Sequence, residues 1–218
     1  MNTKIKEDQF AEFEKYDVLS DKDVFSKIWL QPRRVFKFIN DTKYEKYFYV
    51  LMFLAGVLRA LDRTSSKENT SLFFVILTSL FIGGLLGWIS YYIYAALLSW
   101  TGKWLDGKGD TSSIFRMMAY AMFPSILSIV FLILQIDLDG NNIFNNYDYT
   151  AENNLINIIV YTSVFIKIGL SVVSLIFMVI GLSVVQNFSI GKTILNLILP
   201  ILFIVVPIVL IASLAMVF

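Results

Sequence analysis

The chain has 218 residues, of which 57% are hydrophobic and only 16% are charged, and its mean hydropathy is +0.68. A soluble domain carries about 25% charged residues, so this composition predicts a membrane protein. The net charge is +1, and the lack of Cys and His excludes disulfides, thiolate nucleophiles, imidazole bases and the usual zinc and haem sites. We therefore expect no catalytic residues, no metal, no cofactor and no enzymatic activity.

The first 46 residues are largely polar and hold ten of the 18 Lys and Arg residues. Residues 1–19 predict a flexible polar tail. The pattern changes at Ser20, which forms the first position of a potential capping box with Asp23. The next apolar side chains fall on one helical stripe, which predicts a short amphipathic helix. They are Val24, Phe25, Ile28 and Trp29.

A second helix is expected from Pro32, because proline suits the first turn of a helix and cannot continue the preceding one. Val35, Phe36 and Ile39 share one face of this helix. Three cations flank that face: Arg33, Arg34 and Lys37. Residues 20–46 are therefore predicted to form an interfacial helix pair.

Residues 29–38 interleave aromatic side chains with cations, a pattern that fits two kinds of surface. A groove for single-stranded nucleic acid stacks bases on rings and holds phosphates with cations. Beside membrane spans, the simpler interpretation is a helix pair on the cytoplasmic leaflet, with its rings in lipid and its cations on anionic headgroups. We expect lipid or partner contacts, and no nucleic acid, from Trp29, Arg33, Arg34, Phe36 and Lys37.

Five apolar runs follow, at residues 47–61, 72–98, 114–136, 155–185 and 194–218. A hydrocarbon core of about 30 Å needs roughly 20 helical residues, so the second to fifth runs suffice and the first is short. Snorkelling of Lys43 and Lys46 would extend the first run. The sequence thus predicts an all-α integral membrane bundle, in which residues 20–218 form a single domain of five transmembrane helices preceded by the amphipathic interfacial helices.

Orientation follows from the cations near the ends of the spans, because Lys and Arg resist transfer to the outside. An N-terminus inside gives the cytoplasmic side the ten cations of the N-terminal region and four more: Lys103, Lys108, Arg116 and Lys192. The opposite side then has only three: Arg59, Arg63 and Lys67. This bias predicts a cytoplasmic N-terminus, an outward loop at residues 137–152 and a C-terminus outside.

Two glycine motifs fall within or between the spans. Residues 83–87 place glycines four apart on one helical face, which favours close packing against another span of the same molecule over a dimer seam. Residues 102–108 resemble a phosphate-binding loop, but Gly109 stands where the magnesium-binding hydroxyl belongs. A turn, with Thr111 or Ser112 capping the next helix, explains this segment better.

Lys167 is the sharpest anomaly, because it lies twelve residues into a long apolar run. We favour a run that begins outside the bilayer, so that Lys167 snorkels to the outer interface. If Lys167 is instead buried, it needs a partner, either Asp62 or a bound anion. Prolines also break the third and fifth spans, as in transporters and in many structural helices. The residues of this candidate intramembrane polar site are Arg59, Asp62, Arg116, Tyr120, Pro124 and Lys167.

Two of these segments carry a resemblance. Pro32-Arg-Arg-Val-Phe36 before the first of five spans, together with Tyr120-Ala-Met-Phe-Pro124 in the third, resembles the Yip family of Ypt/Rab-interacting membrane proteins and their bacterial relatives. For the eukaryotic branch, the resemblance implies five spans, a cytosolic N-terminus, homo- or hetero-oligomers and recruitment of Rab-type GTPases. The chain lacks the Asp-Leu-Tyr-Gly-Pro segment typical of that branch, so a Rab partner rests on the resemblance alone.

Two functional hypotheses follow. The first is a non-enzymatic membrane protein that organises membrane or recruits a partner through its basic, aromatic cytoplasmic N-terminal region, in a bacterial inner membrane. The alternative is a small-solute or ion transporter or channel, with a cavity between proline-broken helices. A water-accessible polar cavity lined by Lys167 would favour transport, and a solid core would favour the first hypothesis.

Overall fold

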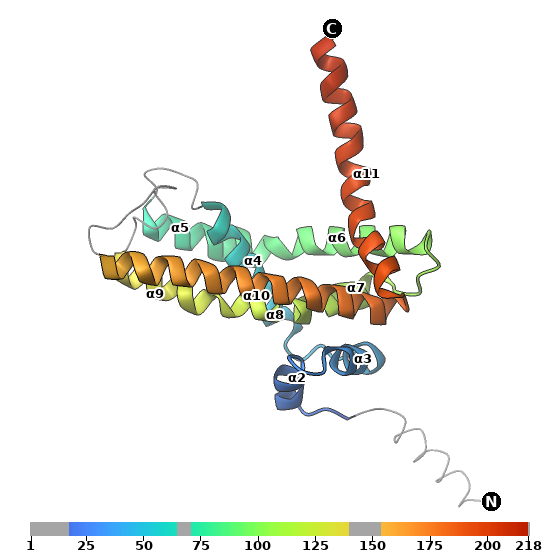
Figure 1. Cartoon of the computed structure of the whole chain (residues 1–218), viewed down its shortest axis with the longest axis horizontal. Coiled ribbons are helices and arrows are strands. Elements are labelled where there is room, and N and C mark those ends of the chain that lie inside the picture. The colour runs from blue at the N-terminus through green and yellow to red at the C-terminus, as the bar shows by residue number, and fades with distance from the viewer. Residues whose placement is uncertain (1–17, 65–70, 140–153, 218) are drawn as a thin grey trace, which may run out of the picture.

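The computed structural model describes residues 18–64, 71–139 and 154–217, and every regular element in these ranges is a helix. This confirms the all-α class. The predicted tail at residues 1–17 and residues 140–152 of the predicted outward loop lie outside the described residues. Short helices α2 and α3 lie on one side of a set of long antiparallel segments, and α11 leaves on the opposite side (Figure 1).

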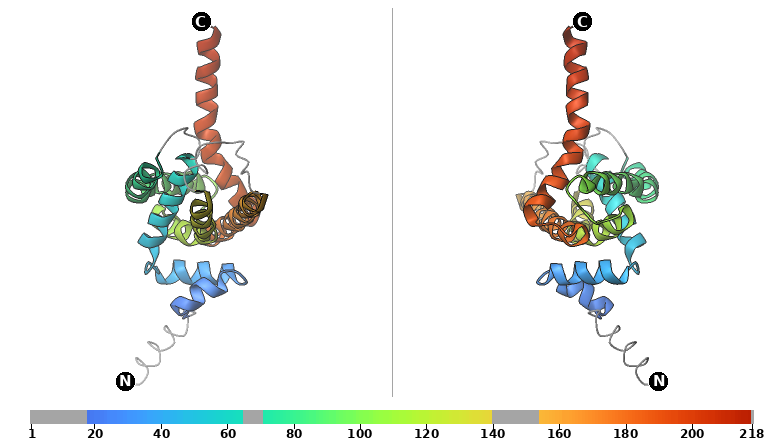
Figure 2. Two further views of the ribbon diagram at one scale, coloured as in Figure 1. Left: turned by 90° about the vertical axis from the view of Figure 1, so that its left-hand side faces the viewer. Right: turned by 90° about the vertical axis from the view of Figure 1, so that its right-hand side faces the viewer.

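The two N-terminal helices form where the sequence predicted them. In α2 (Asp21–Lys27), the hydroxyl of Ser20 accepts from the backbone N–H of Asp23 at 3.2 Å, and the Asp23 carboxylate accepts from the Ser20 N–H at 3.1 Å. This confirms the capping box. Helix α3 (Pro32–Thr42) begins at the predicted proline and ends where Lys43 adopts a left-handed φ of 51°. Figure 2 shows α3 lengthwise while the long segments are seen end-on, so α3 lies crosswise to them.

Within the described residues, three long segments lie side by side and alternate in direction (Figure 1). The first segment consists of α5 (Leu72–Thr78), η1 (Ser79–Leu85) and α6 (Leu86–Lys103). The second consists of α7 (Thr111–Ala121), α8 (Phe123–Leu127) and α9 (Ile129–Asp139), and the third is α10 (Asn154–Gln186). The second segment is interrupted at Met122, directly before the turn that holds Pro124, because proline has no N–H to continue the helix.

By length and composition, four described regions could cross a membrane: Leu72–Lys103, Thr111–Leu138, Asn154–Gln186 and Ile190–Val209. The first expected span is α4 (Phe48–Thr64), whose 17 residues fall short of the roughly 20 that a straight crossing needs. Instead of running parallel to the long segments, α4 crosses them (Figures 1 and 2). The structure therefore supports four of the five expected spans.

The last helix, α11 (Ile190–Val217), is continuous through both of its prolines, so the predicted break of the fifth span is wrong. Each proline removes one backbone N–H, a loss that a helix of this length tolerates. Its first turns pack on α6 and α10, and the rest projects away from the long segments (Figure 1). The ring of Trp100 contacts that of Phe203 at a centroid distance of 4.9 Å, but residues 201–209 remain exposed. The described chain thus differs from a compact five-helix bundle, because one apolar helix has little protein to cover it.

The closest helix contact joins α4 to η1. A Cβ on Gly56 would lie 2.1 Å from the carbonyl oxygen of Gly83, and a Cβ on Gly83 would lie 2.6 Å from the carbonyl oxygen of Gly56. A Cβ on Gly87 would lie 2.9 Å from the Gly56 Cα. The glycine face predicted at residues 83–87 therefore packs within the molecule, as expected.

The main hydrophobic core lies where the N-terminal helices meet the long segments. Its members that lie in helices come from α2, α3, α4, α6, α7, α8 and α10. The largest fully buried side chains include Tyr120, Phe36, Met117 and Leu182. The core is therefore concentrated at the half of α7 and α10 that faces α3, which fixes the position of the helix pair.

We expect Gly83→Ala to destabilise the protein by about 1–3 kcal/mol, because the added methyl group meets backbone that cannot move aside. Gly169 in α10 provides the matched control, since a Cβ there would meet no atom within 4 Å. Gly169→Ala should be neutral or stabilising by up to about 1 kcal/mol, as helix propensity predicts. Thermal unfolding in detergent measures both, and equal effects would contradict the close contact.

Candidate functional site

The apolar face of α3 is covered by protein. Phe36 is only 1% exposed, and its ring packs edge-on against that of Phe177 in α10 at a centroid distance of 6.3 Å. Trp29 lies between Phe123 and Phe177, at 6.2 and 5.9 Å, and keeps 39% exposure. Of the two aromatic residues predicted to contact lipid or a partner, Trp29 is accessible, whereas Phe36 is enclosed by α7 and α10.

The opposite face of α3 carries the predicted cations. Arg33, Arg34 and Lys37 are all exposed. Arg34 donates to the side-chain oxygen of Gln31 at 3.1 Å. We call these three residues the α3 cationic face. Because the apolar side chains of α3 point into the protein, this face points away from it and can meet an anionic surface.

Asp21 of α2 binds residues 44–47, the segment that directly precedes α4. Its carboxylate accepts from the hydroxyl of Tyr44 at 2.6 Å, from that of Tyr47 at 3.4 Å and from the ammonium of Lys46. The Lys46 and Tyr44 hydrogen bonds lower the pKa of Asp21 below its usual value. A lowered pKa means that this contribution to folding is present at neutral pH and is lost as the pH falls through the acidic range.

Arg116 and Tyr120 of α7 lie beneath the helix pair. Arg116 donates to the Glu45 carboxylate from Nε at 3.0 Å and from Nη2 at 2.6 Å, and its side chain is 7% exposed. Tyr120 is fully buried and contacts the ring of Tyr44 at 5.8 Å. Among the described residues, the Arg116 Nη1 and the Tyr120 hydroxyl have no hydrogen-bond partner. These two residues therefore belong to the docking of the N-terminal region.

Lys167 and Asp62 meet in a different place. The Lys167 ammonium forms an ion pair with the Asp62 carboxylate, although 105 residues separate them in the chain. The sequence named Asp62 as the partner that a buried Lys167 would need. Both side chains are partly exposed, at 37% and 44%. The favoured interpretation of the sequence, that Lys167 snorkels to the outer interface and needs no partner, stays a prediction, because the ion pair does not place Lys167 at a depth in the membrane.

Arg59 lies one turn before Asp62 on α4, and its guanidinium stacks over the ring of Tyr91 at 5.3 Å from the centroid. Arg59, Asp62 and Lys167 line one cavity of about 190 Å³. The rest of its lining is Ala55, Leu58, Tyr91, Met122, Ser125, Ile126, Ser128 and Ser171. The six residues predicted as one polar site are thus divided: three line this cavity, while Arg116 and Tyr120 lie under α2 and α3 and Pro124 is buried in α8.

One polar cluster was not predicted. Gln186 is fully buried at the end of α10, where its side-chain oxygen accepts from the Gly109 N–H at 2.9 Å and its amide donates to the Leu98 carbonyl at 3.1 Å. A Cβ on Gly102 would lie 2.1 Å from the Gln186 amide nitrogen, so this glycine makes room for it. In the sequence, the feature that could have indicated this cluster is the amide side chain of Gln186 at the end of an apolar run.

The turn interpretation of residues 102–108 is confirmed, because this segment joins α6 to α7 against Gln186. The predicted cap is wrong. Helix α7 is capped by Asp110, whose carboxylate accepts from the Ser113 N–H at 3.2 Å, and neither Thr111 nor Ser112 has that role. Asp110 is one residue earlier, and its side chain reaches the N3 position as a capping residue must.

The comparisons with known proteins agree with the membrane architecture. A family model described as the Yip1 domain matches residues 26–211, which includes α3, the cavity at Lys167 and most of α11. This confirms the resemblance seen in the sequence. Comparison with curated proteins and with solved structures gave no match.

We expect Asp62 and Lys167 to be energetically coupled. In a double-mutant cycle of Asp62→Asn and Lys167→Met, the coupling free energy should be about 0.5–1 kcal/mol, because both side chains retain partial exposure. Lys192 and Asp106 provide the control pair, since they lie 4.0 Å apart with 52% and 96% exposure and should show almost no coupling. Equal coupling of the two pairs, measured by thermal unfolding, would contradict the special role of Lys167.

Proposed function

Because the chain belongs to the Yip1 domain family, we propose that this membrane protein has a non-enzymatic role, in which it organises membrane or recruits a partner through the α3 cationic face. The observation that carries the proposal is the division of α3 into two faces. Its apolar residues are buried against α7 and α10, whereas Arg33, Arg34 and Lys37 are exposed.

The orientation of α3 supports contact with a membrane surface. If the long segments cross the bilayer, a helix that lies crosswise to them runs parallel to the surface (Figure 2). Each Lys or Arg close to anionic lipid contributes about 1 kcal/mol, so three cations contribute enough for a stable contact. The part-exposed ring of Trp29 suits the same boundary between apolar and wet surroundings.

The proposed topology keeps the five spans predicted from the sequence, with α4 as a short span oblique to the long segments (Figure 1). The N-terminus and the ends of α6 and α10 then lie in the cytoplasm and the C-terminus lies outside. Figure 1 shows the ends of α6 and α10 together at one end of the long segments, with the starts of α5 and α10 at the other. The cation bias of the sequence favours the first end as cytoplasmic. A bacterial inner membrane is proposed from the family resemblance of the sequence alone.

The family also suggests partners. Homo-oligomers are proposed from the resemblance, and a Rab-type GTPase belongs to the eukaryotic branch alone. We favour anionic headgroups as the first partner of the α3 cationic face. The transport alternative is weaker, because the lysine of the cavity at Lys167 is already neutralised by Asp62.

The topology can be tested with single cysteines, since the chain has no native Cys. Ser71 directly precedes α5 and Ser112 lies in the first turn of α7, and both residues are exposed. The starts of α5 and α7 lie at opposite ends of the long segments (Figure 1). In intact cells, an impermeant thiol reagent should label Ser71→Cys, and Ser112→Cys only after permeabilisation. Labelling of Ser112→Cys from outside would reverse the proposed orientation.

We expect the α3 cationic face to contact anionic lipid in the assembled protein. An environment-sensitive fluorophore on Leu30→Cys, a position that is 88% exposed, should shift to shorter wavelength in anionic nanodiscs compared with neutral ones. High salt should reverse the shift, because ions screen surface charges. Replacing Arg33, Arg34 and Lys37 together with Gln should abolish it.

The matched control removes the same number of charges from elsewhere on the proposed cytoplasmic side. Lys103, Lys108 and Lys192 are exposed, and all lie outside α3. Their combined replacement by Gln should leave most of the fluorescence shift intact. An equal loss in both triple variants would mean that total charge, and not the α3 cationic face, is responsible.

A further inference from the structure

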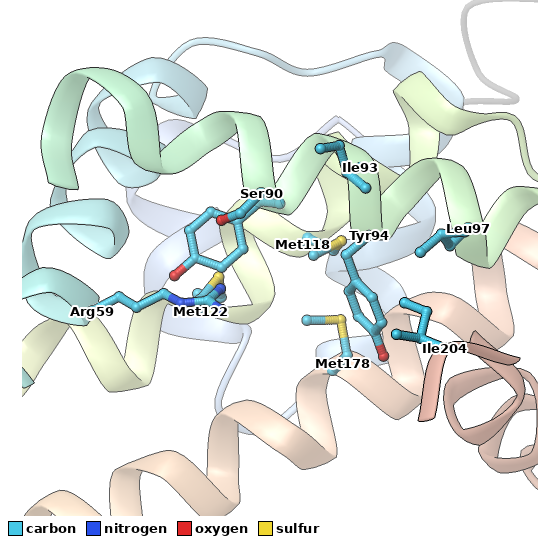
Figure 3. Close-up of a pocket in the computed structure, with 10 residues that line it drawn as sticks. Arg59, Ser90, Ile93, Tyr94, Leu97, Met118, Met122, Met178 and Ile204 are labelled. Carbon is cyan, nitrogen blue, oxygen red and sulfur yellow. The ribbon is translucent and has the colours of Figure 1, made fainter. Parts of the chain in front are cut away.

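A second cavity adjoins the one that contains Lys167. It has a volume of about 430 Å³, and the two cavities share Arg59, Tyr91 and Met122 in their walls. Figure 3 shows Arg59 extending toward Met122 at one end, with Tyr94, Met178 and Ile204 gathered at the other. A larger, mostly apolar chamber is therefore joined to a smaller polar one at Arg59.

The other polar side chains of the larger cavity are already hydrogen-bonded. The Tyr91 hydroxyl donates to the Ala55 carbonyl at 3.3 Å, and the Tyr94 hydroxyl donates to the Leu197 carbonyl at 3.3 Å. Ser90 donates to the Gly87 carbonyl at 2.8 Å. A guanidinium carries five N–H donors, so Arg59 is the lining residue with donors to spare.

The charges around Arg59 do not balance. Arg59, Asp62 and Lys167 are the charged residues that line the two cavities, and two cations with one carboxylate leave a net charge of +1. Asp62 is engaged by Lys167. Among the described residues, no ion pair involves Arg59, whose guanidinium rests on the ring of Tyr91. The Arg59 side chain is exposed at a surface that lipid would cover, and a cation there is unfavourable without an anion, so the site favours one more negative charge.

The larger cavity opens toward surfaces that lipid would cover. Ile93 of α6 and Ile204 of α11 line it while remaining 55% and 47% exposed. A free inorganic anion would use Arg59 but leave this apolar wall unoccupied. An amphiphile with one anionic group and a hydrocarbon chain satisfies both parts at once, because burial of each methylene group contributes about 0.8 kcal/mol.

We propose that the joined cavities bind one membrane phospholipid. Its phosphate lies against the Arg59 guanidinium beside Lys167, and one acyl chain lies along Ile93, Leu97, Met178 and Ile204. Arg59 is the specificity-determining residue, since a planar guanidinium forms two parallel hydrogen bonds to a phosphate. The α3 cationic face is a separate surface, so this site does not depend on it.

The experiment uses the full chain in a neutral detergent, with thermal unfolding measured at high ionic strength to screen surface contacts. Three probes are compared: phosphatidylglycerol, diacylglycerol of the same acyl composition, and inorganic phosphate. A ligand that binds only the folded state raises the unfolding midpoint. Phosphatidylglycerol should stabilise the wild type, and the other two should not, because each supplies only one half of the ligand.

Variants then locate the site. Arg59→Gln should weaken phosphatidylglycerol binding roughly tenfold or more, the effect expected for a charge-assisted hydrogen bond. Leu97→Trp should reduce it by filling the apolar chamber. Lys103→Gln removes an exposed cation that lies outside both the cavities and the α3 cationic face, and it should leave the stabilisation unchanged.

Several outcomes would overturn the proposal. Equal stabilisation by diacylglycerol or by inorganic phosphate would show that the two halves do not act together. Loss of the effect in Arg33→Gln, which removes a cation of the α3 cationic face, with retention in Arg59→Gln, would move the lipid to that face. If Arg59→Gln does not fold, Leu97→Trp decides: unchanged stabilisation by phosphatidylglycerol in that variant rules out the cavity.

Discussion

The contact between Gly56 of α4 and Gly83 of η1 determines where the other parts of the structure can lie. With no side chain on either residue, the backbone of α4 crosses that of η1 at a separation that any Cβ would prevent. Arg59 and Asp62 follow within two turns of Gly56. The crossing therefore brings Arg59 to the ring of Tyr91 and Asp62 to the ammonium of Lys167.

The same crossing positions the N-terminal helices, because α4 connects to them directly. Asp21, Glu45 and their partners hold the connection with hydrogen bonds and ion pairs, and the aromatic side chains of α2 and α3 fill the core against α7 and α10. The apolar face of α3 is thereby buried against other helices of the protein. The exposed side chains of α3 include Arg33, Arg34 and Lys37, so the helix pair presents a cationic surface, and protein contacts hold its apolar face.

The two halves of the predicted polar site have different physical roles. Arg116 has a carboxylate partner in Glu45 and is enclosed, which suits a fixed joint between elements. Arg59 lacks such a partner among the described residues and borders a cavity, which suits recognition of an external anion. Both are arginines near apolar helices in the sequence. Burial and the engagement of the nearest carboxylate distinguish them in the folded chain.

Local and periodic features were determined by the sequence alone: the membrane class, the all-helical fold, the capping box at Ser20, the helix start at Pro32, the break before Pro124 and the glycine face of η1. Each depends on residues within a few positions of one another, where backbone chemistry acts directly. Tertiary structure decided what covers each face. Phe36 packs against α10 instead of lipid, Lys167 pairs with Asp62, which lies 105 residues away in the chain, and Gln186 binds the turn between α6 and α7. The sequence could not predict these contacts, because periodicity identifies an apolar or charged face but carries no information on the distant segment that packs against it.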